Sequence, residues 1–145
     1  DLLGSRGLGD VYKRQIPLFP YHIPKSKQMN NLTEKISSAD NLIIAMGVHN
    51  YSINDSLKII LDTCFKNVEG KFFGIICASG GEKSYLSTMH LSQICMNEWK
   101  MIQLPRIIYG ARKDFENNQI KSQQLIDWID LFCNEFKEIG NKLMN

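Results

Sequence analysis

The sequence predicts an α/β fold with a parallel sheet, because helical patterns alternate along the chain with short, continuous apolar runs. Two such runs, residues 42–48 and 72–78, contain no charged or amide side chain. A strand that is covered on both faces has this composition, which is typical of parallel sheets. Parallel strands that alternate with helices need right-handed crossovers, so we expect an open sheet between helical layers.

The first half of the chain gives an extended segment, a helix, a strand and a second helix. Residues 16–24 are extended, since each proline biases its predecessor away from helix. The helix before strand 42–48 and the helix after it are predicted by apolar residues that recur three and four positions apart. Asn54 or Asp55 is available to cap the second helix, and Gly70 lies just beyond its end. The two stripes are Met29, Leu32, Ile36 and Ala39, and then Leu57, Ile60, Leu61, Cys64 and Phe65.

The second half begins with strand 72–78, which ends at the small residues 79–81. Residues 84–99 are expected to be helical. A third strand covers residues 101–104 and is either stopped by Pro105 or extended by residues 107–109. A long carboxy-terminal helix follows, and its apolar face is expected to pack against the sheet rather than to form a coiled coil. That face consists of Leu125, Ile129, Phe132, Phe136, Ile139 and Leu143.

Charge and composition exclude several kinds of partner. The chain has 17 basic and 15 acidic residues that are well mixed, with a net charge of +2, so no broad positive field attracts nucleic acid or anionic membrane. No run approaches the ~20 apolar residues that span a bilayer. The amino end also lacks the pattern of a signal peptide. We therefore expect a cytoplasmic protein that binds neither nucleic acid nor membrane.

The cysteines do not form a recognisable metal or redox motif. Cys64, Cys77, Cys95 and Cys133 are widely spaced among apolar neighbours, and the three histidines are scattered. The expectation is four reduced, buried thiols and no metal site.

The first fifteen residues, DLLGSRGLGDVYKRQ, differ in composition from the Asn-, Lys- and Ile-rich remainder. We expect residues 1–15 to be non-native read-through and residues 16–145 to form the domain. Gly4-Ser5-Arg6 resembles a phosphate-binding loop, but such a loop needs a buried strand before it and a helix after it. Only three residues precede it, and three prolines soon follow.

Two loops are the candidate binding site, because ligands of open parallel sheets bind beyond the carboxyl ends of the strands. The first spans residues 47–52 and the second residues 79–83. Small residues in both let a ligand approach the backbone, and the first adds two flat rings. A planar ligand with a polar edge suits these loops better than a metal does. No His or acid lies at a spacing that would make Ser79 a nucleophile. The candidate site residues are Gly47, Val48, His49 and Asn50, with Ser79, Gly80 and Gly81.

These motifs resemble the NADPH-dependent FMN reductase family. Members read Ala-Asp, an apolar strand, Pro-x-Tyr-Asn-x-Ser, then Leu-Lys-Asn and an Asp one turn later. Here the sequence has Ala39-Asp40, the strand, Val48-His49-Asn50-Tyr51-Ser52, then Leu57-Lys58 and Asp62, and Ser79-Gly80-Gly81 is similar to the family's second flavin loop. The resemblance covers about residues 16–108. In this chain Gly47 stands for the family's proline, His49 for its tyrosine and Ile59 for the last Asn.

The resemblance implies a flavodoxin-like three-layer sandwich that holds FMN. Val48, His49 and Asn50 would lie along the isoalloxazine ring, and the backbone of Gly80 and Gly81 would contact its pyrimidine side. NADPH or NADH would deliver a hydride to the flavin, which would pass it to a flavin, quinone or azo acceptor. The flavin carries this chemistry, so no side chain is expected to be catalytic. Homodimers or tetramers are implied as well.

The resemblance also implies that the fold is incomplete. Family members begin with a strand, a Gly-Ser-x-Arg phosphate loop, a helix and a second strand, and nothing here matches these. We therefore expect the 145-residue chain to bind FMN weakly or not at all. It would also expose the edge and faces of strand 42–48, which is an aggregation hazard.

Three other functions remain open. A quinone or azo-dye reductase would use the same flavin scaffold. A flavodoxin-like interaction subunit without catalysis is compatible with Gly47 and His49. A receiver domain shares the strand order but carries an aspartate where this chain has Gly47-Val48-His49, and a Lys-Pro pair where it has Leu104-Pro105.

Overall fold

The structure is a computed structural model that describes residues 26–144. The expectations for residues 1–15 and 16–24 lie outside the described residues. The first described helix, α2 (Lys27–Ser38), begins where Ser26 accepts a hydrogen bond from the backbone N–H of Met29 at 3.2 Å. This bond satisfies one of the donors that every helix leaves free at its start.

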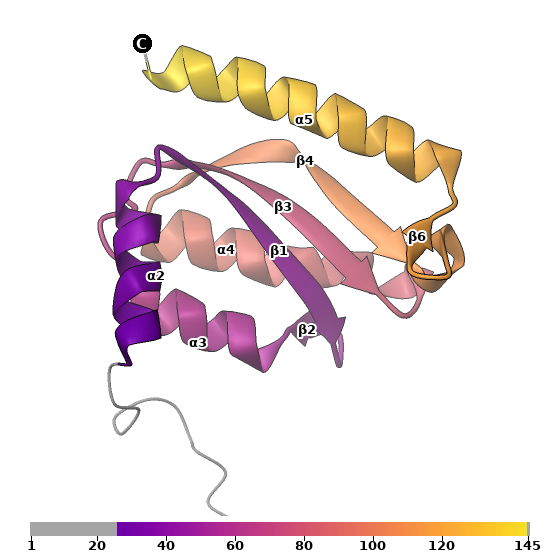
Figure 1. Cartoon of the computed structure of the whole chain (residues 1–145), viewed down its shortest axis with the longest axis horizontal. Coiled ribbons are helices and arrows are strands. Elements are labelled where there is room, and N and C mark those ends of the chain that lie inside the picture. The colour runs from indigo at the N-terminus through magenta and orange to yellow at the C-terminus, as the bar shows by residue number, and fades with distance from the viewer. Residues whose placement is uncertain (1–25, 145) are drawn as a thin grey trace, which may run out of the picture.

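One mostly parallel sheet forms the centre of the fold (Figure 1). Its strands lie in the order β2-β1-β3-β4, and β3 is parallel to both β1 and β4. The short β2 pairs antiparallel with the end of β1. The strands are β1 (Asn41–His49), β2 (Ser52–Ile53), β3 (Phe72–Ser79) and β4 (Ile102–Ala111). The predicted α/β fold with a parallel sheet is confirmed.

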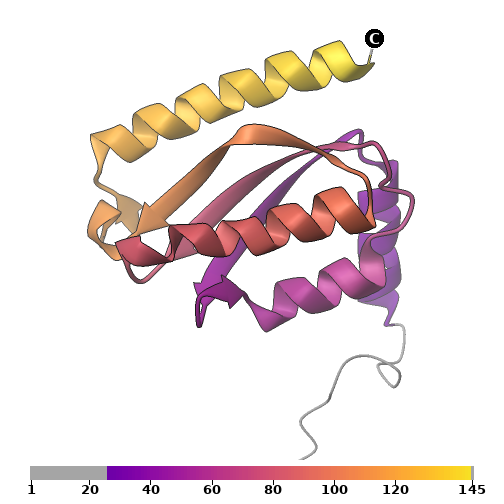
Figure 2. The ribbon, with the colours of Figure 1, turned by 180° about the vertical axis from the view of Figure 1, so that it is seen from behind.

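Helices cover the sheet on both faces, as Figures 1 and 2 show from opposite sides. On one face lie α3 (Asp55–Cys64) and α4 (Thr88–Glu98), with α2 packed against α3. On the other face α5 (Gln123–Met144) lies alone among the described elements. None of the described helices is both long enough and apolar enough to cross a bilayer.

Each face of the sheet has its own apolar core. The core beneath α3 and α4 includes Phe73 and Ile75, and the core beneath α5 includes Ile108 and Phe132. Full burial of each such side chain contributes roughly 1.5–3 kcal/mol to folding. The apolar stripes predicted for α2, α3 and α5 therefore face the sheet or the neighbouring helix, except that Leu143 at the end of α5 is 50% exposed.

Lys71 fastens α2 to the start of β3. Its ammonium group donates to the carbonyl oxygens of Ile36, Ser37 and Ala39 at 3.2, 2.6 and 2.5 Å. The last carbonyls of a helix lack partners within the helix, and a cation satisfies both these acceptors and the negative end of the helix dipole. A charged side chain thus links a helix end to the sheet without a packed apolar contact.

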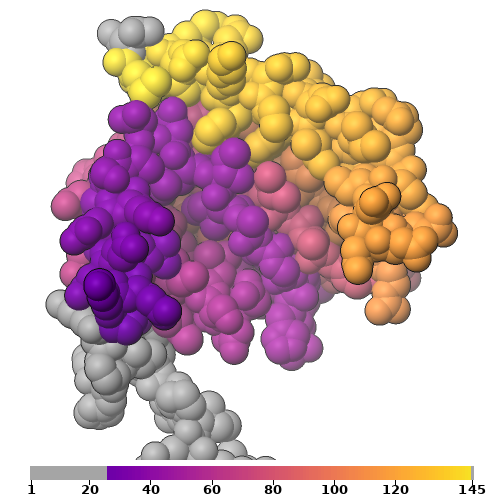
Figure 3. Space-filling model, in the orientation of Figure 1, coloured from indigo at the N-terminus to yellow at the C-terminus, as the bar shows by residue number. Residues whose placement is uncertain are grey.

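The expectation that the chain exposes a face of strand 42–48 is confirmed for the described residues, and the cover on both faces that its apolar run indicates is complete on one face only. Ile44 and Met46 are buried under α3 and α4, whereas Ile43 on the opposite face is 49% exposed. The cause is the position of α5, which packs on β4 and β3 and reaches β1 only near Asn41. Figure 3 shows atoms of β1 at the surface beneath α5.

Pro105 does not end the third strand. β4 continues through it to Ala111, and the pairing with β3 shifts register between Phe73 and Ile75. Proline is tolerated here because β4 is an edge strand of the described sheet, so its missing N–H removes no ladder bond. The extension through residues 107–109 is confirmed, and the stop at Pro105 is wrong.

Several local features differ from the sequence prediction. Helix α3 ends at Cys64, and Gly70 adopts a left-handed φ of 74° in the turn before β3 rather than capping the helix. The segment before α4 is a 3-10 helix, η1 (Glu82–Ser87). Cys64, Cys77 and Cys95 are buried as expected, but Cys133 is exposed. The short helix η2 (Arg112–Asp114) and the hairpin of β5 (Phe115–Glu116) and β6 (Gln119–Ile120) were not predicted.

Candidate functional site

The two candidate loops lie side by side at the carboxyl edge of the sheet. Gly47 of β1 is the register partner of Ala78 of β3, so the residues that follow each of them leave the sheet at neighbouring positions. The prediction that the two turns occupy the tips of adjacent strands is confirmed. Ligands of open α/β sheets bind beyond this edge.

The first candidate segment is a tight hairpin rather than an open loop. Val48 and His49 still belong to β1 and pair with Ile53 and Ser52 of β2. The turn between the strands consists of Asn50 and Tyr51, whose φ values are 48° and 61°. Two left-handed residues in succession are the signature of a two-residue hairpin turn. His49 and Asn50 are exposed at its tip.

The second candidate turn is held by two hydrogen bonds. The hydroxyl of Ser79 accepts from the backbone N–H of Gly81 at 3.3 Å. The phenol of Tyr109, on the neighbouring strand β4, donates to the carbonyl oxygen of Gly81 at 2.5 Å. These bonds fix the turn from within and from the side, while Gly80 and Gly81 stay exposed. The Tyr109 contact was not predicted from the sequence.

Packing among the described residues does not explain the glycines at the site. A Cβ placed on Gly47, Gly80 or Gly81 would meet no heavy atom within 4 Å. By contrast, a Cβ on Gly74 would come within 2.5 Å of Phe132. The site glycines also lack a left-handed φ, so conformation does not require them either. Space kept open at three backbone positions fits a ligand that lies against the chain.

A cavity of about 490 Å³ adjoins the second turn. Ser79 and Gly80 line it together with Arg112 and the β5–β6 hairpin. The side chain of Arg112 makes no ion pair or hydrogen bond with any residue in the described range 26–144. A cation beside small polar residues suits an anionic or carbonyl-bearing ligand group. The sequence did not mark Arg112, because it reaches this turn through the pairing of β4 with β3, in which Ala111 is the partner of Ser79.

The described residues offer no metal site and no activated thiol at this edge. No group of three or more His, Cys, Asp or Glu side chains within residues 26–144 could hold a metal ion. Burial raises the pKa of the Cys77 thiol, on β3, to about 11. A thiol with that pKa stays protonated at neutral pH and is a poor nucleophile. The site is therefore suited to binding a ligand that brings its own chemistry.

The mostly parallel sheet between helical layers, with two turns side by side at its carboxyl edge, defines a flavodoxin-like α/β protein. The chain matches the family described as NADPH-dependent FMN reductase over residues 8–116, and it belongs to that family. The cofactor of the family is FMN, with a nicotinamide nucleotide as co-substrate. No curated protein matches the chain.

Solved structures share this fold at low sequence identity. An oxidoreductase from Corynebacterium diphtheriae superimposes with a TM-score of 0.65 at 15% identity, covering 82% of this chain and 63% of that one. An NADH:FMN oxidoreductase, EMOB, in its apo form gives 0.60 at 18% identity, covering 74% and 59%. An NADPH-quinone reductase from P. pentosaceus gives 0.56 at 19%, covering 75% and 76%. The chain thus spans about three fifths of the length of the first two proteins.

Proposed function

We propose that this chain belongs to an FMN-dependent NAD(P)H oxidoreductase whose flavin ring lies between the tips of β1 and β3. The observation that carries the proposal is the group of open glycines, Gly47, Gly80 and Gly81, at adjacent strand ends. Membership of the FMN reductase family supports the choice of FMN as the ligand. When bound, the flavin accepts a hydride from the nicotinamide and passes electrons to a second acceptor.

Each candidate residue has a binding role in this proposal. Val48, His49 and Asn50 would line one side of the ring, with the hairpin turn holding His49 at the rim. Ser79, Gly80 and Gly81 would offer their backbone to the polar edge of the ring, in a turn fixed by Tyr109. Arg112 would supply positive charge beside this edge. The protein binds and orients the ligand, and no side chain acts as a nucleophile.

We propose weak FMN binding for the 145-residue chain itself. Within residues 26–144 no Gly-Ser-x-Arg turn precedes a helix, so no described element would grip the phosphate. The acceptor of the electrons would be a flavin, a quinone or an azo compound. The protein would act in the cytoplasm as a homodimer or tetramer, without nucleic acid or membrane.

Amide chemical shifts during an FMN titration test the site, because they detect binding even at millimolar affinity. Shifts concentrated at residues 48–50 and 79–81, with a dissociation constant above about 10 μM, are expected. A dissociation constant in the nanomolar range would contradict the proposal that no described element binds the FMN phosphate. Chemical-shift changes at other residues, or no changes at all, would show that FMN does not bind at this site. They would favour an interaction subunit without a cofactor.

Adjacent cations give a matched pair of variants for the same titration. Arg112→Gln is expected to weaken FMN binding by about tenfold or more, since a charge-assisted contact is worth about 1.5–3 kcal/mol. Lys113→Gln is the control, because Lys113 forms an ion pair with Glu82 and does not line the cavity beside Ser79. Equal affinities in the two variants would exclude Arg112 from the site.

A further inference from the structure

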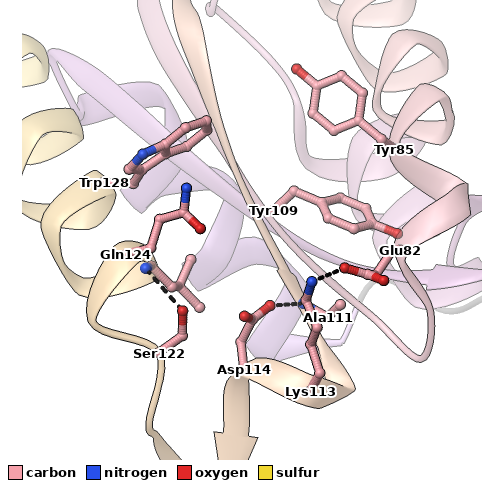
Figure 4. A pocket seen from close by; sticks show the side chains of 10 residues that line it. Glu82, Tyr85, Tyr109, Ala111, Lys113, Asp114, Ser122, Gln124 and Trp128 are labelled. Carbon is pink, nitrogen blue, oxygen red and sulfur yellow. Dashed lines mark hydrogen bonds and ion pairs between the residues drawn. The ribbon is translucent and has the colours of Figure 1, made fainter.

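A second cavity, of about 320 Å³, lies where β4, η1 and the start of α5 meet (Figure 4). None of the seven candidate flavin residues lines it. Its volume falls within the range of about 300–1,000 Å³ that is usual for small-molecule sites. This cavity is therefore separate from the proposed flavin site and does not depend on the proposed function.

Aromatic side chains form opposing walls of this cavity. Tyr85 of η1 and Tyr109 of β4 stand edge to face, with ring centroids 5.7 Å apart and planes at 70°. Trp128 enters from α5 on the other side, as Figure 4 shows. Tyr85 is 47% exposed and Trp128 is 46% exposed. Covering exposed, flat apolar faces with a flat ring lowers the free energy.

The polar groups of the cavity disfavour an anionic ligand. Glu82 and Lys113 neutralise each other as an ion pair across the rim. The carboxylate of Asp114 already accepts the backbone N–H of Ala111 at 2.8 Å. One negative charge therefore remains, which disfavours anionic ligands. The side-chain amide of Gln124 and the indole N–H of Trp128 have no hydrogen-bond partner among the described residues, so both can donate to a carbonyl group.

We propose that this cavity binds an uncharged, planar aromatic molecule that carries a carbonyl group. Its ring would lie between the indole of Trp128 and the phenols of Tyr85 and Tyr109. Its carbonyl oxygen would accept a hydrogen bond from Gln124 or from the indole N–H. The bound ring would contact Tyr109, whose hydroxyl also holds the turn at Gly81.

The indole N–H resonances of ¹⁵N-labelled protein report directly on this site. The chain has two tryptophans, and Trp99 packs on Phe65 at the other end of the fold, with ring centroids 5.2 Å apart. The probe is naphthalene-2-carboxamide, which is flat, uncharged and inert toward thiols. The Trp128 resonance is expected to shift with saturable binding, while that of Trp99 stays in place. If the Trp128 signal does not respond to millimolar probe, the site does not exist.

Naphthalene-2-carboxylate is the matched anionic probe. It keeps the two rings and replaces the amide by a charged group, so binding about tenfold weaker than that of the carboxamide is expected. Equal or tighter binding of the carboxylate would overturn the preference for uncharged ligands.

Two exposed positions of α5 provide the variants. Trp128→Leu keeps an apolar side chain but removes the flat wall, and about tenfold weaker binding is expected from shifts of the Gln124 side-chain amide. Leu131→Ala is the control, since Leu131 is 43% exposed on the same helix and does not line the cavity. Both proteins should fold, as circular dichroism can verify. Unchanged affinity in Trp128→Leu, or equal losses in both variants, would refute a stacking site.

Discussion

The phenol hydroxyl of Tyr109 donates a hydrogen bond to the carbonyl oxygen of Gly81, over a distance of 2.5 Å. The two residues are 28 positions apart in the sequence. Tyr109 lies on β4, and Gly81 lies in the turn that follows the neighbouring strand β3. The turn at residues 79–81 is therefore positioned by β4 and not by its own sequence alone. Both the proposed flavin site and the cavity beside Trp128 adjoin this contact.

Tyr109→Phe should loosen the second turn while leaving the fold intact. One hydrogen bond at an exposed carbonyl is worth about 1 kcal/mol or less, because water replaces the lost donor. Amide hydrogen exchange at Gly80 and Gly81 is expected to accelerate several-fold. Tyr85→Phe is the control, since its hydroxyl bonds to no described residue. Equal exchange rates in both variants would show that the contact does not order the turn.

Two glycine substitutions should separate packing from ligand binding. Gly74→Ala is expected to lower the free energy of unfolding by about 1–3 kcal/mol, since its Cβ would lie 2.5 Å from the buried ring of Phe132. Gly47→Ala should change it by less than about 0.5 kcal/mol, because nothing lies within 4 Å. The same Gly47 variant should weaken the FMN-induced shifts. Urea unfolding measures the first two effects, and a destabilised Gly47→Ala would mean that the space there is not open.

One thiol should react in the native protein. Cys133 is exposed, while burial raises the pKa of Cys77 to about 11 and that of Cys95 to about 12. A maleimide reagent at neutral pH is expected to modify one site, because the other three thiols are buried and inaccessible. Mass spectrometry counts the adducts, and Cys133→Ser should remove the single fast one. More than one fast adduct would indicate opening of the core.

The Arg106–Glu135 pair should make stability depend on pH. Arg106 donates twice to the carboxylate, at 2.7 and 2.8 Å, and this lowers the pKa of Glu135. A group with a lowered folded pKa stabilises the protein above its unfolded pKa of about 4.3, and this contribution disappears as the pH falls through the folded value. Glu135→Gln should therefore be destabilising at pH 7 but not at pH 2.

Glu138→Gln is the matched control for that experiment. Glu138 pairs with Lys142 on the solvent side of the same helix, where both side chains are mostly exposed. Exposed pairs of this kind contribute little. If Glu138→Gln lowered the free energy of unfolding at pH 7 as much as Glu135→Gln does, the ion pair between Arg106 and Glu135 would contribute no more than an exposed pair. Urea unfolding at both pH values gives the comparison.

Ile43→Lys should reduce self-association of the chain. Ile43 is 49% exposed in the middle of β1, on the sheet face that α5 leaves open. A lysine there discourages both apolar contact and strand addition. Light scattering at rising concentration should show smaller particles, with unfolding free energy nearly unchanged. Ile102→Lys, at an equally exposed position of β4, is the control and should have no such effect.

Sequence periodicity was sufficient to predict the elements with strong apolar patterns. Helices α2, α3 and α5 and strands β1 and β3 lie where the apolar spacing placed them. The unbroken apolar run of β1 indicated cover on both faces, and only the resemblance to the family indicated an exposed face. Pro105 was misjudged as a stop, because its cost depends on whether a partner needs its N–H, and only the strand order decides that.

The site was predicted in part for similar reasons. Small residues after apolar strands marked Gly47 and the turn at residues 79–81, and the sheet order placed the two turns together. Arg112 and Tyr109 reach the site through the pairing of β4 with β3, which joins residues distant in sequence. Asn117 and Asn118, both at left-handed φ, were a readable signal for that hairpin.

The two edges of the sheet differ in whether another strand can pair with them. Along β4, Pro105 and the register shift interrupt the row of backbone donors. Residues 41–47 of β1 have no strand partner on one side among the described residues. On that side β2 pairs only with residues 48 and 49. If a second molecule paired with this edge through its own β1, its interrupted β4 edge would face outward. Growth by strand addition would therefore stop after two molecules, so the geometry permits a closed pair and opposes a fibre.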